Sequence, residues 1–330
     1  MEKRKAKGIG LLSGGLDSIL AVKILQDQDV DLICVTYVTP FFGPQAGIAA
    51  GRLAGVEVQP IDITREHLEM LKHPRYGYGS QMNPCIDCHA LMLREAGKLM
   101  EREGADFLFT GEVLGQRPMS QRRDSLRSVE KLSGYQGRIL RPMSARLLPP
   151  TMVEEEGLVD RERLLDIHGR SRKRQMELAA HYGIEDYPQP GGGCVLTKEG
   201  FANKLRRLFL HYPEAGAREI EILKWGRHFL LPGSSLFAVG RRQMDNQRLE
   251  SLAGPRDFLL HVADYPGPAG VLLAPPDPEA DLAAAARLLI AYSDAPADSQ
   301  VKVEWTRGGE SGVFHESDPG RDYLQDRLIQ

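Results

Sequence analysis

Apolar residues in the first half of the chain form short continuous runs that alternate with segments of helical periodicity. The runs predict strands at Gly8–Leu12, Asp31–Tyr37, Val56–Ile61, Asp106–Thr110 and Arg138–Leu140. The helical periodicity predicts helices at Asp17–Gln26, Pro44–Leu53, Arg65–Leu71 and Cys85–Arg102. An unbroken apolar run such as Leu32-Ile33-Cys34-Val35 is typical of a strand buried on both faces of a parallel sheet. The alternation therefore predicts an α/β fold with a doubly wound parallel sheet, whose ligands bind at the carboxyl ends of the strands.

Beyond residue 148 the pattern changes twice. Residues 149–182 are charged and predicted to be helical, most clearly at Ser171–His181; a Pro- and Gly-rich loop, Tyr187–Cys194, and a helix at Phe201–Leu210 follow. From about residue 216 we predict strands at Ile220–Leu223, His228–Leu231, Leu236–Val239, Phe258–Val262, Val271–Leu273 and Val301–Trp305, a helix at Glu279–Tyr292 and a polar, partly irregular tail beyond Thr306. The chain is thus expected to have three parts: an α/β domain (1–148), a helical segment (149–212) and a small α+β domain (213–330).

Composition narrows the class of protein. The 330 residues, 42% of them hydrophobic, suffice for two or three domains. No run is apolar enough to span a bilayer, and the basic N-terminus leads into a strand instead of a signal-peptide core, so we expect a cytoplasmic protein with no membrane partner.

The net charge of −3 predicts no general attraction to nucleic acid. Basic residues nevertheless gather in local clusters, which can bind phosphates. The clusters are Arg117, Arg122, Arg123 and Arg127; Arg161, Arg163, Arg170, Arg172, Lys173 and Arg174; and Lys204, Arg206 and Arg207. For any single cluster, a solvated helix face is the simpler interpretation.

The stretch Ser13-Gly14-Gly15-Leu16-Asp17-Ser18 joins the first strand to the first helix. Adjacent glycines permit a tight turn, and the first N–H groups of a helix have no acceptor within it, so this geometry creates an anion site. Ser13 and Ser18 add hydroxyl groups, and the Asp17 carboxylate is a ligand suited to magnesium. The alternative is an ordinary Ser- and Gly-rich turn in which Asp17 caps the helix.

A second polar stretch, Thr110–Gln116, follows the fourth strand at the sheet edge where ligands bind. Gly111 permits close backbone approach, and either Glu112 or Gln116 is placed to position a nucleotide or a base. A plain loop role for Gln116 is equally consistent with the sequence.

The spacing of three of the four cysteines is compatible with a shared functional site. Cys34 lies in an apolar strand and is expected in the core. Cys85 and Cys88 share one face at a helix N-terminus, which lowers the pKa of a thiol, and Cys194 follows a Gly-Gly-Gly stretch. This set is compatible with a redox pair, with part of a zinc site that includes His89, with three ligands of a 4Fe–4S cluster, or with unrelated buried thiols.

Together these motifs resemble a known family. The stretch Ser13–Ser18 resembles the SGGxDS signature of the PP-loop ATP pyrophosphatases, which split ATP between its α- and β-phosphates. Thr110–Gln116, followed by Ser120-Gln121, is similar to the tRNA 4-thiouridine synthases, and Asn83–Cys88 is similar to the tRNA 2-thiouridylases. More faintly, Val239-Gly240-Arg241-Arg242 and Asn246 resemble the NFACT-R (DUF814-like) domain associated with RNA binding.

The resemblance implies an ATP-dependent tRNA sulfurtransferase. ATP would adenylate a uridine carbonyl oxygen in tRNA, and sulfur would then displace AMP. The cofactors it implies are ATP, Mg²⁺ and a 4Fe–4S cluster, with zinc as the alternative. The implied site residues are Asp17, Cys88 and Cys194 in catalysis; Cys85, Cys88 and Cys194 as metal ligands; and Ser13, Gly14, Gly15, Asp17, Ser18, Thr110, Gly111 and Gln116 at the nucleotide.

Several alternatives stay open. The 4-thiouridine synthases usually begin with an RNA-binding domain that does not precede the loop here, so later basic segments would hold tRNA and the target uridine is undefined. Sulfur would come from sulfide or from a cysteine desulfurase; in a persulfide route Cys194 carries the sulfur and Cys88 resolves the disulfide. A small-molecule amide ligase and a non-catalytic RNA-binding module are the rival functions. A homodimer is one alternative for the assembly.

Overall fold

The computed structural model describes residues 4–187, 193–274, 278–296, 299–317 and 327–329. They form two compact units that divide between Cys194 and Val195. This division lies inside the segment 149–212 that the sequence set apart. Most of the Pro- and Gly-rich loop, residues 188–192, lies outside the described residues.

The first unit contains a parallel sheet of five strands in the order β3-β2-β1-β4-β5. The strands are β1 (Lys7–Leu11), β2 (Asp31–Val38), β3 (Val58–Asp62), β4 (Phe107–Thr110) and β5 (Ile139–Leu140). Gly10 in β1 pairs with Cys34 in β2 and with Phe109 in β4. A Cβ atom on Gly10 would lie 2.2 Å from the Phe109 ring, so this glycine makes room for the aromatic core. The expected α/β class with a parallel sheet is confirmed.

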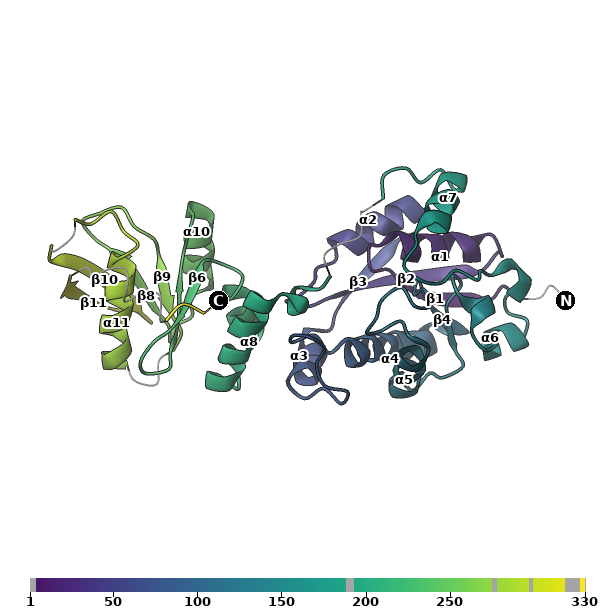
Figure 1. Ribbon diagram of the computed structural model, residues 1–330, viewed down its shortest axis with the longest axis horizontal. Coiled ribbons are helices and arrows are strands. Elements are labelled where there is room, and N and C mark those ends of the chain that lie inside the picture. Colours follow the sequence, from purple (N-terminus) through teal and green to yellow (C-terminus); the bar gives the residue numbers. More distant parts are fainter. Residues whose placement is uncertain (1–3, 188–192, 275–277, 297–298, 318–326, 330) are drawn as a thin grey trace. The chain divides into compact units, whose positions relative to one another are not determined.

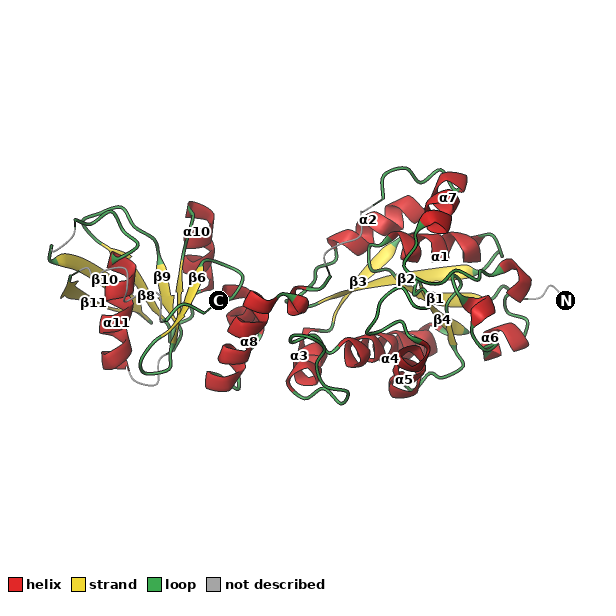
Figure 2. Ribbon diagram, in the orientation of Figure 1, coloured by secondary structure: helices red, strands yellow, loops and turns green. Residues whose placement is uncertain are grey.

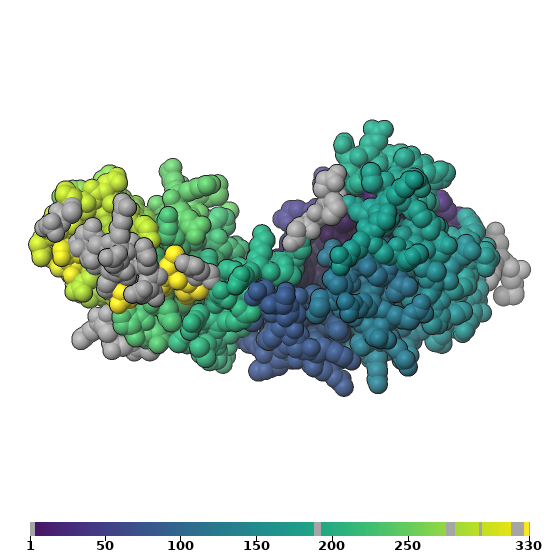
Figure 3. All heavy atoms as spheres, in the orientation of Figure 1, coloured from purple at the N-terminus to yellow at the C-terminus, as the bar shows by residue number. Residues whose placement is uncertain are grey.

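Helices cover both faces of this sheet (Figure 1). On one face lie α1 (Leu16–Gln26), α2 (Gln45–Ala54) and α7 (Lys173–His181); on the other lie α3 (Thr64–Lys72), α4 (Cys85–Glu103) and α5 (Arg123–Ser133). Two apolar clusters fill the layers, one around Leu20 and Phe109 and one around Ile9 and Leu91. In the space-filling view, teal atoms of the segment that includes α7 cover much of the purple N-terminal segment (Figure 3).

The expectation of a largely helical segment at 149–182 is wrong. Apart from α7, this stretch has only the short helix α6 (Met152–Glu155) and one turn of 3₁₀-helix at Arg161–Arg163. Gly157 and Gly169 adopt positive φ angles of 66° and 79°, which interrupt helical structure. Between α6 and α7 the chain runs through turns that return it to the carboxyl edge of the sheet, where His168 bridges to Leu114.

The second unit contains an antiparallel sheet of six strands in the order β11-β10-β8-β9-β7-β6 (Figure 2). The strands are β6 (Arg227–Leu230), β7 (Leu236–Val239), β8 (Phe258–Val262), β9 (Gly270–Leu272), β10 (Val301–Arg307) and β11 (Glu310–Glu316). Its helices are α8 (Glu199–His211), α9 (Ala217–Ile222), α10 (Gln243–Leu252) and α11 (Pro278–Ile290). Leu288 and Leu289 of α11 pack with Phe237 in the core.

One prediction for this unit is wrong, and one strand was not predicted. Residues 220–223, predicted as a strand, belong mainly to α9, because the Glu219 carboxylate accepts a hydrogen bond from the Gly216 N–H at 2.8 Å and caps a helix there. Within the tail, Glu310–Glu316 form strand β11, which the sequence did not predict: Gly308 and Gly309, both at positive φ, close a hairpin that pairs Phe314 with Val303.

Candidate functional site

The loop after β1 lies where the strand order reverses. From β1 the chain continues outward through β2 and β3, whereas from β4 it continues to β5, so the edge between β1 and β4 is the position where doubly wound sheets bind ligands. Gly14 turns the loop with a φ of 91°, and Gly15 precedes the first residue of α1. The Ser18 hydroxyl donates to the Gly15 carbonyl at 2.7 Å. The loop therefore presents the N-terminus of α1 at the switch point.

At Gly111, the backbone of the loop after β4 packs against this turn. A Cβ atom on Gly111 would lie 2.4 Å from the Ser18 backbone nitrogen and 2.6 Å from the Asp17 carbonyl oxygen. The sequence predicted a close approach at Gly111 to a ligand; the structure places its backbone against α1 instead. Thr110 is also turned inward, since it is buried and its hydroxyl donates to Glu112 at 3.1 Å.

Gly111→Ala is expected to destabilise the first unit by about 1–3 kcal/mol, because backbone atoms cannot yield as a flexible side chain does. Thermal unfolding measures the change. Gly15→Ala is the matched control in the same loop, since Gly15 has a φ of −85° and its Cβ would lie 3.6 Å from the Ser13 hydroxyl. Equal melting temperatures for the two variants would contradict the close packing of the two loops.

Asp17 has one carboxylate oxygen with a partner and one without. Gln116 donates its amide to Oδ2 at 3.0 Å, whereas Oδ1 is buried and has no hydrogen-bond partner among the described residues. Burial raises the pKa of Asp17, opposed by the Gln116 hydrogen bond and by the charges of Arg172 and Arg117. A buried carboxylate oxygen that lacks a donor, at a helix N-terminus, fits the coordination of a hydrated magnesium ion.

Helix α7 adds residues to this site from far along the chain. Gln175 is fully buried, its two amide atoms have no hydrogen-bond partner in the described structure, and the amide favours the ionised form of Asp17. The Arg172 guanidinium lies 6.0 Å from the centroid of the Tyr187 ring. Sequence reasoning assigned Arg172 to RNA phosphates and missed Gln175, whose polar character on a buried helix face was the available signal.

Arg174, from the same basic cluster, forms an ion pair with Asp166 at 2.7 Å. Its hydrogen bond to Asp166 lowers the pKa of that carboxyl. Arg174 is therefore paired at the protein surface, whereas the charge of Arg172 acts on Asp17.

Glu112 is the centre of a buried charge network. Its carboxylate contacts the His89 ring nitrogen Nδ1 at 2.8 Å and accepts a hydrogen bond from Arg141 Nε at 2.9 Å; Arg141 also pairs with Glu130. Burial alone would raise the pKa of Glu112, but the charge of Arg141 and the hydrogen bond to His89 lower it to about 2. Glu112 is thus occupied by bonds within the protein. Of the two residues expected to position a ligand, Gln116 is the one that contacts the Ser13–Ser18 loop, through Asp17.

The two helical cysteines lie at the start of α4, on the same edge of the sheet. Asn83 donates to the Cys85 sulfur at 3.4 Å and does not cap the helix, whose N-cap residue is Pro84. Burial raises the pKa of the Cys88 thiol, with further contributions from the charges of Cys194 and Cys85. The three predicted thiols therefore lie within electrostatic reach of one another, but the expectation that the helix N-terminus lowers the pKa is wrong for Cys88, because burial outweighs it. Cys34 is a core residue, 1% exposed.

His67 is the imidazole nearest to these thiols, and the sequence did not identify it. Its Nε2 atom lies 3.5 Å from the Cys88 sulfur, and its ring packs against Phe41 and Phe42, with centroids 5.3 Å and 5.6 Å away. Burial lowers the pKa of His67 to about 4. His89, expected as a fourth zinc ligand, is bound to Glu112 instead.

The donor chemistry of these side chains fits a soft metal or an iron–sulfur cluster. Within the described ranges, however, no group of three Cys, His, Asp or Glu side chains lies close enough together to hold a metal ion. No helix in the same ranges combines the length and apolar character needed to cross a membrane.

Comparison with known proteins gives limited similarity. No curated protein matches the chain. A solved structure of a predicted subunit of tRNA methyltransferase from Methanocaldococcus jannaschii is 15% identical, covering 53% of this chain and 76% of its own, with a TM-score of 0.34. The C-terminal part of the fibronectin/fibrinogen-binding protein from Streptococcus suis is 12% identical, covering 80% of this chain and 98% of its own, with a TM-score of 0.29. Similarity at these TM-scores does not establish a shared function.

The C-terminal unit has a sequence match of its own. The profile of the NFACT protein RNA-binding domain matches residues 226–317, the stretch from β6 through β11. This match confirms the resemblance carried by residues 239–242 and Asn246. In the structure Asn246 is part of the framework, because its side-chain oxygen accepts a hydrogen bond from the Ala269 N–H at 3.1 Å. Residues 226–317 are therefore similar to an RNA-binding domain.

Proposed function

We propose that this protein is an ATP-dependent tRNA sulfurtransferase of the PP-loop class, which replaces a uridine carbonyl oxygen with sulfur. The observation that carries the proposal is the orphaned Oδ1 atom of Asp17, buried beside a glycine turn and a helix N-terminus at the switch point of a parallel sheet. Thiols at the same edge and the RNA-binding match in the second unit support the sulfur and RNA parts of the proposal.

The residues of the loop have distinct roles in the proposed adenylation. A carbonyl oxygen is a poor leaving group, and transfer of AMP to it creates a good one. The amides of Ser13–Ser18 bind the departing pyrophosphate, and Asp17 holds Mg²⁺, which neutralises the charge that develops. Gln116 orients Asp17 through its hydrogen bond at 3.0 Å. Arg117 and Arg172, whose charges act on Asp17, flank the phosphates.

Sulfur transfer falls to the cysteines in this proposal. Cys85, Cys88 and Cys194 would have to draw closer together than in the described structure to hold a 4Fe–4S cluster, which would supply an iron without a protein ligand. In the persulfide alternative, zinc has only a structural role and a cysteine desulfurase loads a persulfide onto Cys194. The outer sulfur of that persulfide attacks the adenylated carbon and displaces AMP; the Cys88 thiolate then attacks the Cys194 sulfur, which releases the thiolated product and leaves a Cys88–Cys194 disulfide for an external thiol to reduce. Burial raises the pKa of the Cys88 thiol, so formation of its thiolate depends on what the site binds.

The RNA assignment is tested by mass spectrometry of tRNA nucleosides from a strain that lacks the gene. We expect one thiouridine to disappear and the wild-type gene to restore it, whereas genes with Cys88→Ala or Cys194→Ala do not. Cys34→Ala is the matched control, because it removes a buried thiol outside the group, and it should restore the nucleoside. An unchanged set of thionucleosides in the deletion strain would refute the assignment.

A further inference from the structure

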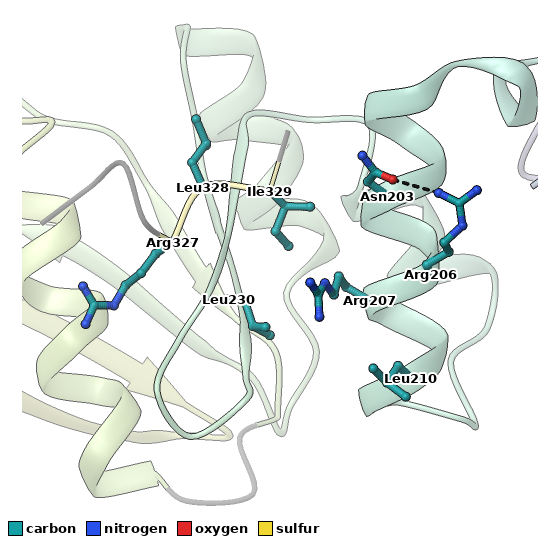
Figure 4. Close-up of a pocket in the computed structure, with 8 residues that line it drawn as sticks. All are labelled: Asn203, Arg206, Arg207, Leu210, Leu230, Arg327, Leu328 and Ile329. Carbon is teal, nitrogen blue, oxygen red and sulfur yellow. Dashed lines mark hydrogen bonds between the residues drawn. The ribbon is translucent and has the colours of Figure 1, made fainter. Parts of the chain in front are cut away.

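A cavity of about 480 Å³ lies within the second unit, between α8 and the edge of the antiparallel sheet (Figure 4). One face of α8 forms a wall, because its lining residues recur at the spacing i, i+3, i+4 and i+7. Strand β6 and the C-terminal stretch form the opposite wall. The lining residues are Asn203, Arg206, Arg207, Leu210, Leu230, Arg327, Leu328 and Ile329.

The wall opposite α8 is built by main-chain hydrogen bonds. Leu230 N–H donates to the Arg327 carbonyl at 3.0 Å, and Ile329 N–H donates to the His228 carbonyl at 2.9 Å. The C-terminal stretch thereby continues the sheet beyond β6. The cavity consequently has two fixed walls, a helix and an extended strand edge.

The lining combines positive charge with apolar surface. Three of the lining residues are arginines, of which Arg207 faces the space between α8 and β6 whereas the Arg327 guanidinium extends away from α8 (Figure 4); the described lining residues include no carboxylate. Arg207 extends from α8 toward the space between the helix and β6, while Arg206 turns toward Asn203, to which it donates a hydrogen bond at 2.8 Å (Figure 4). Leu210 is 66% exposed, so its apolar side chain is accessible to a ligand in the cavity. Guanidinium groups bind phosphate oxygens, and apolar side chains contact the faces of bases.

We propose that this cavity binds a nucleotide of a single-stranded RNA segment, with its phosphate on Arg207 and its base against Leu210 and Ile329. The inference rests on the proposed RNA substrate and extends it, because α8 and the C-terminal stretch lie outside the matched residues 226–317. The volume is within the range of about 300–1,000 Å³ that is usual for small-ligand sites. The Arg207 guanidinium beside apolar side chains, with no carboxylate among the described lining residues, favours an RNA nucleotide over a purely apolar protein segment.

The test uses the full-length protein and fluorescence anisotropy with a labelled short single-stranded RNA and a labelled tRNA transcript. Leu210→Glu should weaken binding about 10-fold or more, whereas Leu210→Lys, whose aliphatic stem can still contact the base and whose charge attracts phosphate, should weaken it far less. Arg207→Gln should weaken binding about 3- to 10-fold and reduce the slope of log K against log salt by about one. Lys198→Gln is the charge control, because Lys198 is exposed in the same unit but lies outside both the cavity lining and residues 226–317.

The outcomes separate this inference from the proposed function. If the wild-type protein binds RNA and Leu210→Glu and Arg207→Gln bind equally well, the cavity is not an RNA site, and the sulfurtransferase proposal stands. If the wild-type protein binds neither the short single-stranded RNA nor the tRNA transcript, both the cavity inference and the sulfurtransferase proposal are wrong. Equal weakening by Leu210→Glu and Leu210→Lys would indicate a steric effect on folding or packing and would likewise overturn the inference, as a thermal unfolding profile of each variant would establish.

Discussion

Asp17→Asn is expected to reduce RNA-dependent formation of AMP from ATP by about 100- to 1,000-fold, the usual effect of removing one electrostatic contact to a transition state. The amide keeps an oxygen that accepts the hydrogen bond from Gln116, but it lacks the charge that binds Mg²⁺. Release of AMP from radiolabelled ATP, titrated with Mg²⁺, measures the effect.

Loss of folding does not explain this expected defect. Burial raises the pKa of Asp17, so the charged carboxylate is less favourable in the folded protein than in the unfolded chain. Neutralising it at pH 7 should therefore leave stability unchanged or increase it. Asp29→Asn, at an exposed aspartate of the same unit, is the matched control. Wild-type AMP formation by Asp17→Asn would contradict the role of this carboxylate.

Glu112→Gln is expected to lower the free energy of unfolding by about 3–5 kcal/mol, because it leaves the buried Arg141 guanidinium with less compensating charge. The Glu112 side chain is 7% exposed and that of Arg141 is 2% exposed, so water screens this pair little. Urea unfolding at pH 7 measures the change. Glu69→Gln is the control, since Glu69 is 71% exposed in its pair with Arg65 and should cost at most about 1 kcal/mol.

The same residue gives the stability a defined pH dependence. The pKa of Glu112 falls from 4.5 to about 2 on folding, so its stabilisation is complete above pH 4.5 and is lost as the pH falls toward 2. Glu112→Gln should lose stability less steeply than the wild type across this window. Parallel curves for the two proteins would mean that Glu112 does not change its pKa on folding.

The strands of the central sheet could be predicted from the sequence because a local run of apolar residues marks each of them. Strands such as β2 are continuous apolar runs, and buried strands of this kind need no distant partner to be identified. Helix α5 was not predicted, because only Leu126, Val129 and Ser133 of its residues are buried and its surface is charged. Strand β11 was missed for a similar reason: apart from Val313 and Phe314 it is polar, and pairing with β10 orders it.

The candidate site was predictable only in part. The turn at Ser13–Ser18 and the residues Gly111 and Gln116 follow strands directly, and parallel strands place such loops at one edge. Gln175 and His67 reach the same region from helices that are distant in the sequence, so no local spacing of residues predicts their place in the site. The direction of the Cys88 pKa was wrong because burial is a tertiary property, whereas the helix position that suggested a low value is local.

The account is tested most directly by measuring AMP and thiouridine in one reaction. Purified protein is incubated under argon with ATP, Mg²⁺, a tRNA transcript and sulfide, and both products are quantified from the same sample. We predict that AMP forms only when tRNA is present and that thiouridine accumulates with it in equal amount. Release of ADP instead of AMP, or AMP formation that is independent of tRNA and yields no thiouridine, would contradict the account.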